Sequence, residues 1–185
     1  NYYQPFHELL PYEGRFLDLG CGYGFMCYTL HWASQGKRLF TGVDYDEDKI
    51  ATAQHCFSRT EALQFVQGDI STYALEKYNG IIISDVLHYL QPLAQEQVIA
   101  HAIDSLLPGG VLIIRDGDAD LKEKHKGTKF TELLSTKIFS FNKTTNQLHF
   151  LSGKMIEALV IKKEVTLQRI DHTKYTSNVI WVIRK

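Results

Sequence analysis

Cysteine is scarce in this sequence, and Cys21, Cys27 and Cys56 form neither a Cys-x-x-Cys pair nor a metal-ligand spacing. A small, odd set of cysteines argues against a disulfide framework and is typical of a reducing compartment. An excess of either charge is also lacking, with 20 Lys and Arg against 21 Asp and Glu. Without a net positive charge, the chain as a whole gives no support for binding to a nucleic-acid backbone.

Long apolar runs are missing as well, and no stretch approaches the roughly 18 residues that a membrane-spanning helix needs. We therefore expect a cytoplasmic protein. The length of 185 residues suits one well-buried domain over residues 1–185, with 1–14 as a lead-in. The chain begins at Asn1 without methionine, which predicts either missing residues or a domain of a larger protein.

Short apolar runs alternate with helical patterns along most of the chain. We expect strands at 15–19, 39–43, 64–67, 80–84 and 111–115, and helices at 24–34, 46–59, 71–77 and 92–107. This rhythm predicts an α/β fold, a parallel sheet with helices on both faces. Residues 164–170 and 178–184 have no helix between them, so they predict an antiparallel hairpin. Ser152 is the expected N-cap of a helix that ends near Lys162.

Residues 16–25, FLDLGCGYGF, place three glycines at every second position after an apolar stretch. The apolar half predicts a buried strand, whereas alternating glycines weaken a strand and have no side chains to pack. Glycine permits unusual torsions and lets a ligand come close to the main chain. A strand that enters a glycine turn and then a helix is how α/β folds seat nucleotide-like ligands.

Four of the predicted strands end in an aspartate, namely Asp18, Asp44, Asp69 and Asp85. Each one alone could be a helix N-cap or a turn residue. The carboxyl ends of parallel strands meet at one edge of a sheet, where such folds bind ligands. Together, the four acids therefore favour a ligand site.

The spacing favours S-adenosylmethionine over a dinucleotide. A dinucleotide fold prefers Gly-x-Gly-x-x-Gly, but the third glycine comes one residue early and Phe25 follows it. Asp18, two residues before Gly20, would be poorly placed beside a pyrophosphate. It suits a cationic amino group, which S-adenosylmethionine carries together with a sulfonium and no phosphate.

The stretches FLDLGCGYG, GVDYD, QGDI, IIISDVLHYL and LLPGGVLIIRD resemble the successive motifs of class I S-adenosylmethionine-dependent methyltransferases. The resemblance implies a Rossmann-like sheet of seven strands in the order 3-2-1-4-5-7-6, with the last strand antiparallel. It also implies S-adenosylhomocysteine as the product.

The resemblance further implies a role for each matching position. The methionine end would be held by Asp18 and by the loop of Gly20, Cys21, Gly22, Tyr23 and Gly24. Asp44 would bind the ribose, and Tyr45 would stack on the adenine. Asp69 would accept from the adenine amino group with the Ile70 amide nearby, and Ser84 and Asp85 would line the methionine side.

His88 is the candidate catalytic base, because it lies where the chain leaves the fourth strand beside the expected methyl group. Histidine titrates near neutral pH, and a base is needed only if the acceptor must lose a proton. The alternative is a histidine that merely packs or caps at this position.

Two other chemistries fit the sequence less well. Metal-dependent catechol-type methyltransferases resemble the chain in their acids after the fourth and fifth strands, here Asp85 and Asp116. Gly117 stands where they have asparagine, so we predict no metal. The Asn/Asp-Pro-Pro-aromatic signature of nucleic-acid amino-methyltransferases is replaced by SDVL at 84–87, so a nucleic-acid acceptor is disfavoured.

Residues 116–151 form a longer connection than the usual loop of about 2 to 6 residues. We predict a lid or substrate wall there, with a dimer face as the alternative, and the oligomeric state stays open. The basic run at 122–129 is interpreted as a solvated loop. Aromatic residues that could wall an apolar or aryl acceptor, or belong in part to the core, are Tyr2, Tyr3, Phe6, Tyr12, Phe130, Phe139 and Phe141.

This long segment is similar to methyltransferase domains at the ends of larger bacterial proteins with acyltransferase and exporter-like modules. That resemblance implies a small-molecule, phenolic (aryl) or acyl-chain (lipid) acceptor and a membrane-associated parent, at the cytoplasmic face of a membrane. Three rival functions remain. One is a catalytically silent module that binds S-adenosylmethionine or S-adenosylhomocysteine, and another is an NAD(P)-dependent oxidoreductase. The third is a relative of the polyamine synthases, which would use a decarboxylated cofactor.

Overall fold

The computed structural model describes residues 2–120, 148–171 and 178–185. In chain order its elements are α1 (Gln4–Leu9), β1 (Gly14–Leu19), α2 (Phe25–Ala33), β2 (Arg38–Asp44), α3 (Glu47–Gln54), β3 (Leu63–Gln67), β4 (Tyr78–Ser84), a 3-10 helix (Leu87–Tyr89), α4 (Pro92–Asp104), β5 (Leu106–Gly117), α7 (Gly153–Lys162), β6 (Thr166–Ile170) and β7 (Asn178–Arg184).

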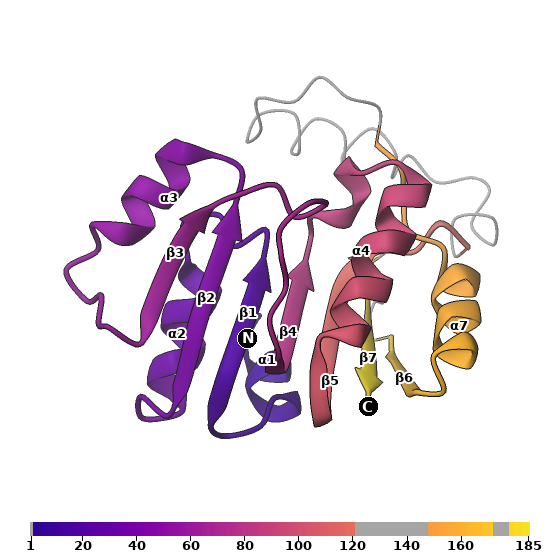
Figure 1. Cartoon of the computed structure of the whole chain (residues 1–185), viewed down its shortest axis with the longest axis horizontal. Helices are drawn as coiled ribbons and strands as arrows, with labels where there is room; N and C mark the ends of the chain where they lie inside the picture. Colours follow the sequence, from indigo (N-terminus) through magenta and orange to yellow (C-terminus); the bar gives the residue numbers. More distant parts are fainter. Residues whose placement is uncertain (1, 121–147, 172–177) are drawn as a thin grey trace.

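The strands form one seven-stranded sheet in the order β3-β2-β1-β4-β5-β7-β6 (Figure 1). Strands β1 to β5 pair in parallel, and β7 is antiparallel to both β5 and β6. This confirms the predicted strand order and the antiparallel hairpin at the end of the chain. The parallel strands point the same way, so their carboxyl ends gather along one edge of the sheet.

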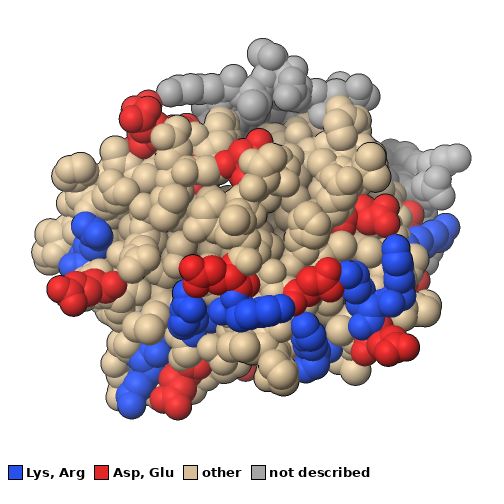
Figure 2. All heavy atoms as spheres, viewed as in Figure 1, with Lys and Arg blue, Asp and Glu red and all other residues tan. Residues whose placement is uncertain are grey.

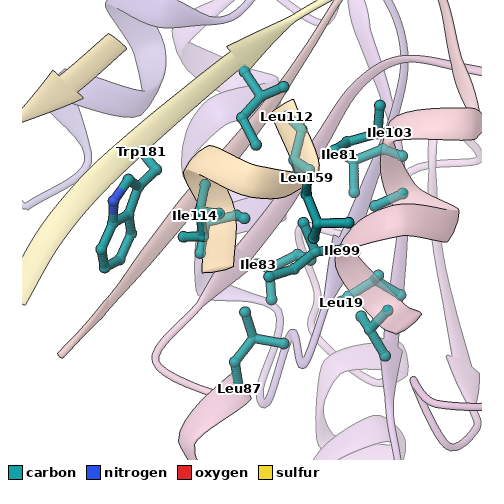
Figure 3. Packing of buried hydrophobic residues seen from close by; sticks show 14 of the residues in the cluster. Leu19, Ile81, Ile83, Leu87, Ile99, Ile103, Leu112, Ile114, Leu159 and Trp181 are labelled. Atoms are coloured by element: carbon teal, nitrogen blue, oxygen red, sulfur yellow. The ribbon is translucent and has the colours of Figure 1, made fainter. Parts of the chain in front are cut away.

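Helices cover both faces of the sheet, each through its own hydrophobic cluster. In Figure 1, α4 and α7 lie in front of the sheet and α2 lies behind it. Ile81 and Ile83 of β4 belong to the cluster beneath α4 and α7 (Figure 3), whereas Ile82 packs with α1, α2 and α3. Successive side chains of a strand point to opposite faces. A strand buried on both faces therefore needs the continuous apolar run seen in this one.

The short helix predicted at 71–77 is wrong. The Asp69 carboxylate accepts hydrogen bonds from the backbone N–H and the hydroxyl of Ser71, at 2.8 and 2.7 Å, so a turn follows β3. The chain then continues without helix until β4 begins, with Tyr73 and Leu75 against the core. With no helix here, Leu39 and Val66 of the neighbouring strands are partly exposed.

Two predicted helices are also shorter than expected. α3 ends at Gln54 and α4 at Asp104, so the Pro-Gly-Gly of 108–110 lies within β5. Leu106 already pairs with Tyr78 of β4. The backbone of 109–110 exchanges hydrogen bonds with Lys185, so pairing with neighbouring strands takes these residues into the sheet.

The lead-in at 1–14 contains α1, which was not predicted, and Phe6 of this helix is fully buried. The predicted N-cap is confirmed, because the Ser152 hydroxyl accepts from the backbone N–H of Met155 at the start of α7.

Most of the predicted lid at 116–151 lies outside the described residues, including the basic run at 122–129, Phe130, Phe139 and Phe141. In the described ranges, no helix has the length and apolarity to cross a membrane.

Candidate functional site

The glycine loop after β1 adopts backbone torsions that favour glycine. Gly20, Gly22 and Gly24 have φ values of 83°, 54° and 77°, which lie in the left-handed region that other residues rarely adopt. A side chain at Gly20 would also meet Val86 at 2.7 Å, whereas nothing lies within 4 Å of the position beside Gly22. Packing explains the first glycine, and Gly22 leaves open space for a ligand.

Asp44, at the end of β2, fixes this loop from the neighbouring strand. Its carboxylate accepts hydrogen bonds from the backbone N–H of Gly22 at 2.8 Å and of Asp46 at 3.0 Å. The side chain is buried, so the backbone amides satisfy part of a carboxylate that would otherwise be costly to bury.

A cleft of about 300 Å³ opens at this edge of the sheet. It brings together seven of the predicted cofactor-binding residues, Gly20, Gly22, Asp44, Tyr45, Asp69, Ile70 and Asp85, and is completed by Lys49, Val86, Tyr89 and Leu90. Among these lining residues, three are acids and one is a lysine. In the view of Figure 2, the visible Lys and Arg side chains lie across the middle and lower parts of the molecule, whereas acidic side chains are visible near the upper edge, where the parallel strands end. The cleft therefore suits a cationic ligand better than a pyrophosphate.

Five predicted cofactor-binding residues are not among those lining the cleft, namely Asp18, Cys21, Tyr23, Gly24 and Ser84. Cys21 is buried, with its sulfur close to Gly42. Tyr23 lines a separate groove between α2 and α3.

Asp18 is buried, and its carboxylate accepts a hydrogen bond from the Cys27 thiol at 3.5 Å. Burial raises the pKa of Asp18 to about 7, and the nearby carboxylate of Asp44 adds to this effect. Burial likewise raises the pKa of the Cys27 thiol, which makes it an unreactive group.

Asp85 is held by side chains from distant parts of the chain. Its carboxylate accepts from the hydroxyl of Tyr2 at 2.8 Å and from the amide of Asn178 at 3.0 Å, and it pairs with Arg115. The Tyr2 ring also lies over the Arg115 guanidinium, 4.7 Å from it. Asp85 has a φ of 56°, a strained conformation for this residue type. These contacts hold it in that conformation.

Ser84 joins the same group, since its hydroxyl donates to Asp85 at 3.0 Å and lies 2.9 Å from the Tyr2 hydroxyl. Sequence reasoning assigned Ser84 and Asp85 to the methionine side but missed Tyr2, Arg115 and Asn178 as their partners. No local motif signals these three contacts, because they join the lead-in, β5 and β7.

His88 lies in the 3-10 helix after β4 and is paired with Asp116 of β5. Its Nδ1 is 2.8 Å from the Asp116 carboxylate, and both side chains are buried. The same carboxylate accepts from the backbone N–H groups of His88 and Gly117. Three donors around one carboxylate orient the imidazole. With Nδ1–H toward Asp116, the Nε2 lone pair lies on the opposite side of the ring.

The Nε2 atom of His88 is buried and has no hydrogen-bond partner among the described residues. An unpaired buried polar atom is costly and calls for an explanation. A cavity of about 280 Å³ lies here, lined by Asp85, His88, Tyr89, Asp116, Gly117, Phe150 and Asn178. Asp85 and Tyr89 line both this cavity and the cleft of about 300 Å³, so the two spaces adjoin.

Asp116 was considered above only as a metal ligand, and the structure instead bonds it to His88. The sequence did carry a signal for this pair. His88 follows β4 and Asp116 lies near the end of the adjacent β5, at the same edge of the sheet, and a histidine beside an acid is a common way to orient an imidazole.

Comparisons with known proteins agree with this geometry. A family model described as a methyltransferase domain matches residues 12–170. A carboxy-S-adenosyl-L-methionine synthase from Wolinella succinogenes is 27% identical over 110 residues, which are 58% of this chain and 46% of that protein. The chain therefore spans less than half the length of this curated relative.

Two solved structures share the fold at low identity. An S-adenosylmethionine-dependent methyltransferase from Mesorhizobium loti has a TM-score of 0.74 and 15% identity, covering 100% of this chain and 98% of the other. Magnesium protoporphyrin IX methyltransferase from Synechocystis, with bound S-adenosylhomocysteine, has a TM-score of 0.70 and 18% identity, covering 100% and 78%.

Proposed function

Since the chain belongs to the methyltransferase-domain family, we propose that it transfers a methyl group from S-adenosylmethionine to the hydroxyl group of a small aryl or lipid-type acceptor. S-adenosylmethionine is the cofactor and S-adenosylhomocysteine the product. The observation that carries the choice of a hydroxyl acceptor is the His88–Asp116 pair. An imidazole oriented by a carboxylate, with its other nitrogen unpaired among the described residues, is placed to take up a proton.

The residues at the cleft fit the cofactor. Asp44 would bind the ribose, Tyr45 would offer its half-exposed ring to the adenine, and Asp69 with the Ile70 amide would bind the adenine edge. The open space beside Gly22 would allow the methionine end to lie against the main chain. Asp18 is not one of the residues that line the cleft. Its role would therefore be to support the glycine loop from its buried position in β1.

The bound cofactor would supply a methyl group that is attached to a cationic sulfur. When the methyl group is transferred, the methyl–sulfur bond breaks and the sulfur is left as a neutral thioether. The protein's task is to align the acceptor, exclude water and remove its proton. His88 Nε2 would accept the hydroxyl proton, and the Asp116 carboxylate would stabilise the resulting imidazolium through Nδ1–H. Asp116 would also keep the neutral imidazole in the tautomer that has its lone pair on Nε2.

The size and lining of the cavity beside His88 support a small or slender acceptor. A volume of about 280 Å³ is at the lower end of the range for ligand pockets. Phe150 and Tyr89 line this cavity with aromatic rings, which suits a phenol or the end of an acyl chain. Membership of a larger, membrane-associated protein would be one way to deliver such an acceptor.

Two other outcomes are separable by experiment. A catalytically silent module would bind S-adenosylhomocysteine and form no methylated product. The curated relative is named for synthesis of carboxy-S-adenosyl-L-methionine, and that activity would appear as a carboxylated cofactor. Binding of a carboxylate group would call for a free cation at the site. Arg115 is paired with Asp85 and stacked on Tyr2, so we favour methyl transfer.

The test compares His88→Ala with His101→Ala, a control histidine exposed on α4. Purified protein is incubated with labelled S-adenosylmethionine and with catechol, p-cresol or a 3-hydroxyacyl ester, and products are identified by mass spectrometry. We expect His88→Ala to lower kcat by about 10²- to 10⁴-fold, with unchanged affinity for S-adenosylhomocysteine and normal turnover by the control. Equal turnover by both variants would remove the base role, and a product methylated on nitrogen or carbon would remove the hydroxyl acceptor.

A further inference from the structure

Among the α-helices that the structure describes, α2 is unusual because it has no acidic residue, lysine or arginine. Its sequence, FMCYTLHWA, contains no Asp, Glu, Lys or Arg, whereas α3, α4 and α7 all contain charged residues. A helix at the surface of a domain normally presents a polar or charged face to water. One face of α2 packs on the sheet through Met26, Cys27 and Leu30, but the other face is apolar as well.

That outer face forms one wall of a groove of about 730 Å³ between α2 and α3. We call it the aromatic groove, and it is lined by Tyr23, Phe25, Tyr28, Thr29, Trp32, Ala51, Thr52, His55 and Cys56. None of these lining residues is an acid, a lysine or an arginine. The groove is separate from the cofactor cleft and from the cavity beside His88, since it shares no lining residue with either.

Tyr28 is buried, but the Tyr, Phe and Trp side chains that line the rest of this groove are well exposed. Phe25 is 65% exposed, Trp32 55% and Tyr23 43%, and Phe57, which follows Cys56 directly, is 99% exposed. A large aromatic side chain buries about 150–250 Å². These four side chains therefore present on the order of 500 Å² of mostly apolar surface. Exposed apolar patches of this area are often sites of interaction with another molecule.

We propose that the aromatic groove and Phe57 form the interface of a homodimer, in which the occupant is the same face of a second copy. A stable interface buries about 800 Å² on each partner, and the four aromatic side chains would supply more than half of that area. Aromatic residues are enriched and charged residues depleted in such interface cores. The formal net charge of -1 adds almost no repulsion between two copies.

A two-fold interface places the same patch on both subunits, so each aromatic side chain can pack against the partner's groove. The groove begins at Tyr23 and Phe25, on either side of Gly24 in the cofactor loop. A second copy seated there would therefore also contact the segment that follows the glycine turn. Leu93 and Ile161, on α4 and α7, are as exposed as the groove residues, at 67% and 78%, but lie on the opposite face of the sheet.

The experiment measures the mass of the whole chain by sedimentation equilibrium and light scattering from about 1 to 200 μM. We expect twice the chain mass of 21.2 kDa at the upper concentrations. Phe57→Glu and Trp32→Glu should shift the mass to that of a monomer across the range. The matched controls Leu93→Glu and Ile161→Glu should remain dimeric.

A second readout uses the two tryptophans, since Trp181 is buried and Trp32 is half-exposed in the single chain. On dilution of the wild-type protein, the emission of Trp32 should shift to longer wavelength as the partner leaves. Phe57 makes almost no contact within its own chain, so Phe57→Glu should keep its circular dichroism and its affinity for S-adenosylhomocysteine.

A wild-type chain that is monomeric at every concentration would overturn the proposal. So would a dimer that persists in Phe57→Glu and Trp32→Glu, or one that the Leu93→Glu control dissociates equally. If Trp32→Glu fails to fold, Phe57→Glu alone decides between these outcomes.

Discussion

The two halves of the sheet's carboxyl edge hold their acids in different ways. In the half proposed to bind the cofactor (the cofactor half), at β1 to β3, Asp44 and Asp69 accept hydrogen bonds mainly from nearby backbone N–H groups. In the half proposed to face the acceptor (the acceptor half), at β4 and β5, Asp85 is held by side chains, and Asp116 binds the His88 imidazole in addition to two backbone N–H groups. The first arrangement shapes the main chain around a ligand, and the second positions reactive side chains.

This difference assigns separate tasks to the two halves. Backbone amides point in directions that the fold fixes, so the cofactor half offers a rigid binding surface. Side-chain partners can be replaced without changing the main chain, so the acceptor half can be adapted to different acceptors. Substitutions on the two sides should therefore separate cofactor binding from turnover.

The largest effect is expected at Asp18, the acid of the cofactor half that is buried against a thiol. Its pKa in the folded protein is raised to about 7 from an ordinary value near 3.8. The stability that comes with the protonated form is fully present below about pH 4 and is lost as the pH rises through 7. The free energy of unfolding should thereby fall by about 4 kcal/mol over this window.

Asp18→Asn keeps the shape of the side chain and removes this titration. Urea unfolding of both proteins at pH 5 and pH 8 checks the difference. If the two proteins lose stability in parallel between these pH values, Asp18 does not titrate in this window.

Asp44→Ala should weaken binding of S-adenosylhomocysteine by about 100-fold. The change removes the acceptor for the Gly22 and Asp46 amides and the proposed ribose contact, and charged hydrogen bonds contribute about 1.5–3 kcal/mol each. Calorimetric titration measures the affinity, with His88→Ala as the matched change in the other half. Equal affinity of the Asp44→Ala and wild-type proteins would place the ribose elsewhere.

Asp116→Asn should lower kcat by about tenfold or more while leaving the affinity for S-adenosylhomocysteine unchanged. The amide cannot stabilise the imidazolium, and it can turn its N–H group toward Nδ1 and favour the wrong tautomer. The pH profile of kcat provides the measurement, because a base acts only when deprotonated and loss of the carboxylate should therefore move the acidic limb of the profile. A lower kcat with an unmoved profile would indicate a structural role instead.

Tyr2→Phe should have the smallest effect, a loss of about 1 kcal/mol in the free energy of unfolding. The change removes the hydroxyl that donates to Asp85 and keeps the ring over Arg115. Tyr12→Phe, an exposed tyrosine in the same lead-in, is the control. Thermal unfolding measures the stability of the two variants. An equal loss of stability in both would contradict a stabilising contribution from the hydrogen bond of Tyr2 to Asp85.

The cofactor half was predictable from the sequence because its signals are local. The glycines and the acids at 18, 44 and 69 belong to short motifs at strand ends, and the strand pattern predicted their common edge. The helix predicted at 71–77 failed because the turn formed by Asp69 and Ser71 outweighs a weak helical pattern. Contacts such as Tyr2 with Asp85 have no local pattern, since they depend on how the whole chain packs.

The left-handed conformation of Asp85 has a consequence for how the protein folds. The residue is held by partners from the lead-in, from β5 and from β7, the last strand of the chain. Strands β1 to β3 follow one another in sequence, so their half of the edge can assemble through short loops. Contacts between distant segments form late because the chain must first close large loops. We therefore expect the cofactor half to form first during folding, and the acceptor half to be completed only when both ends of the chain have docked.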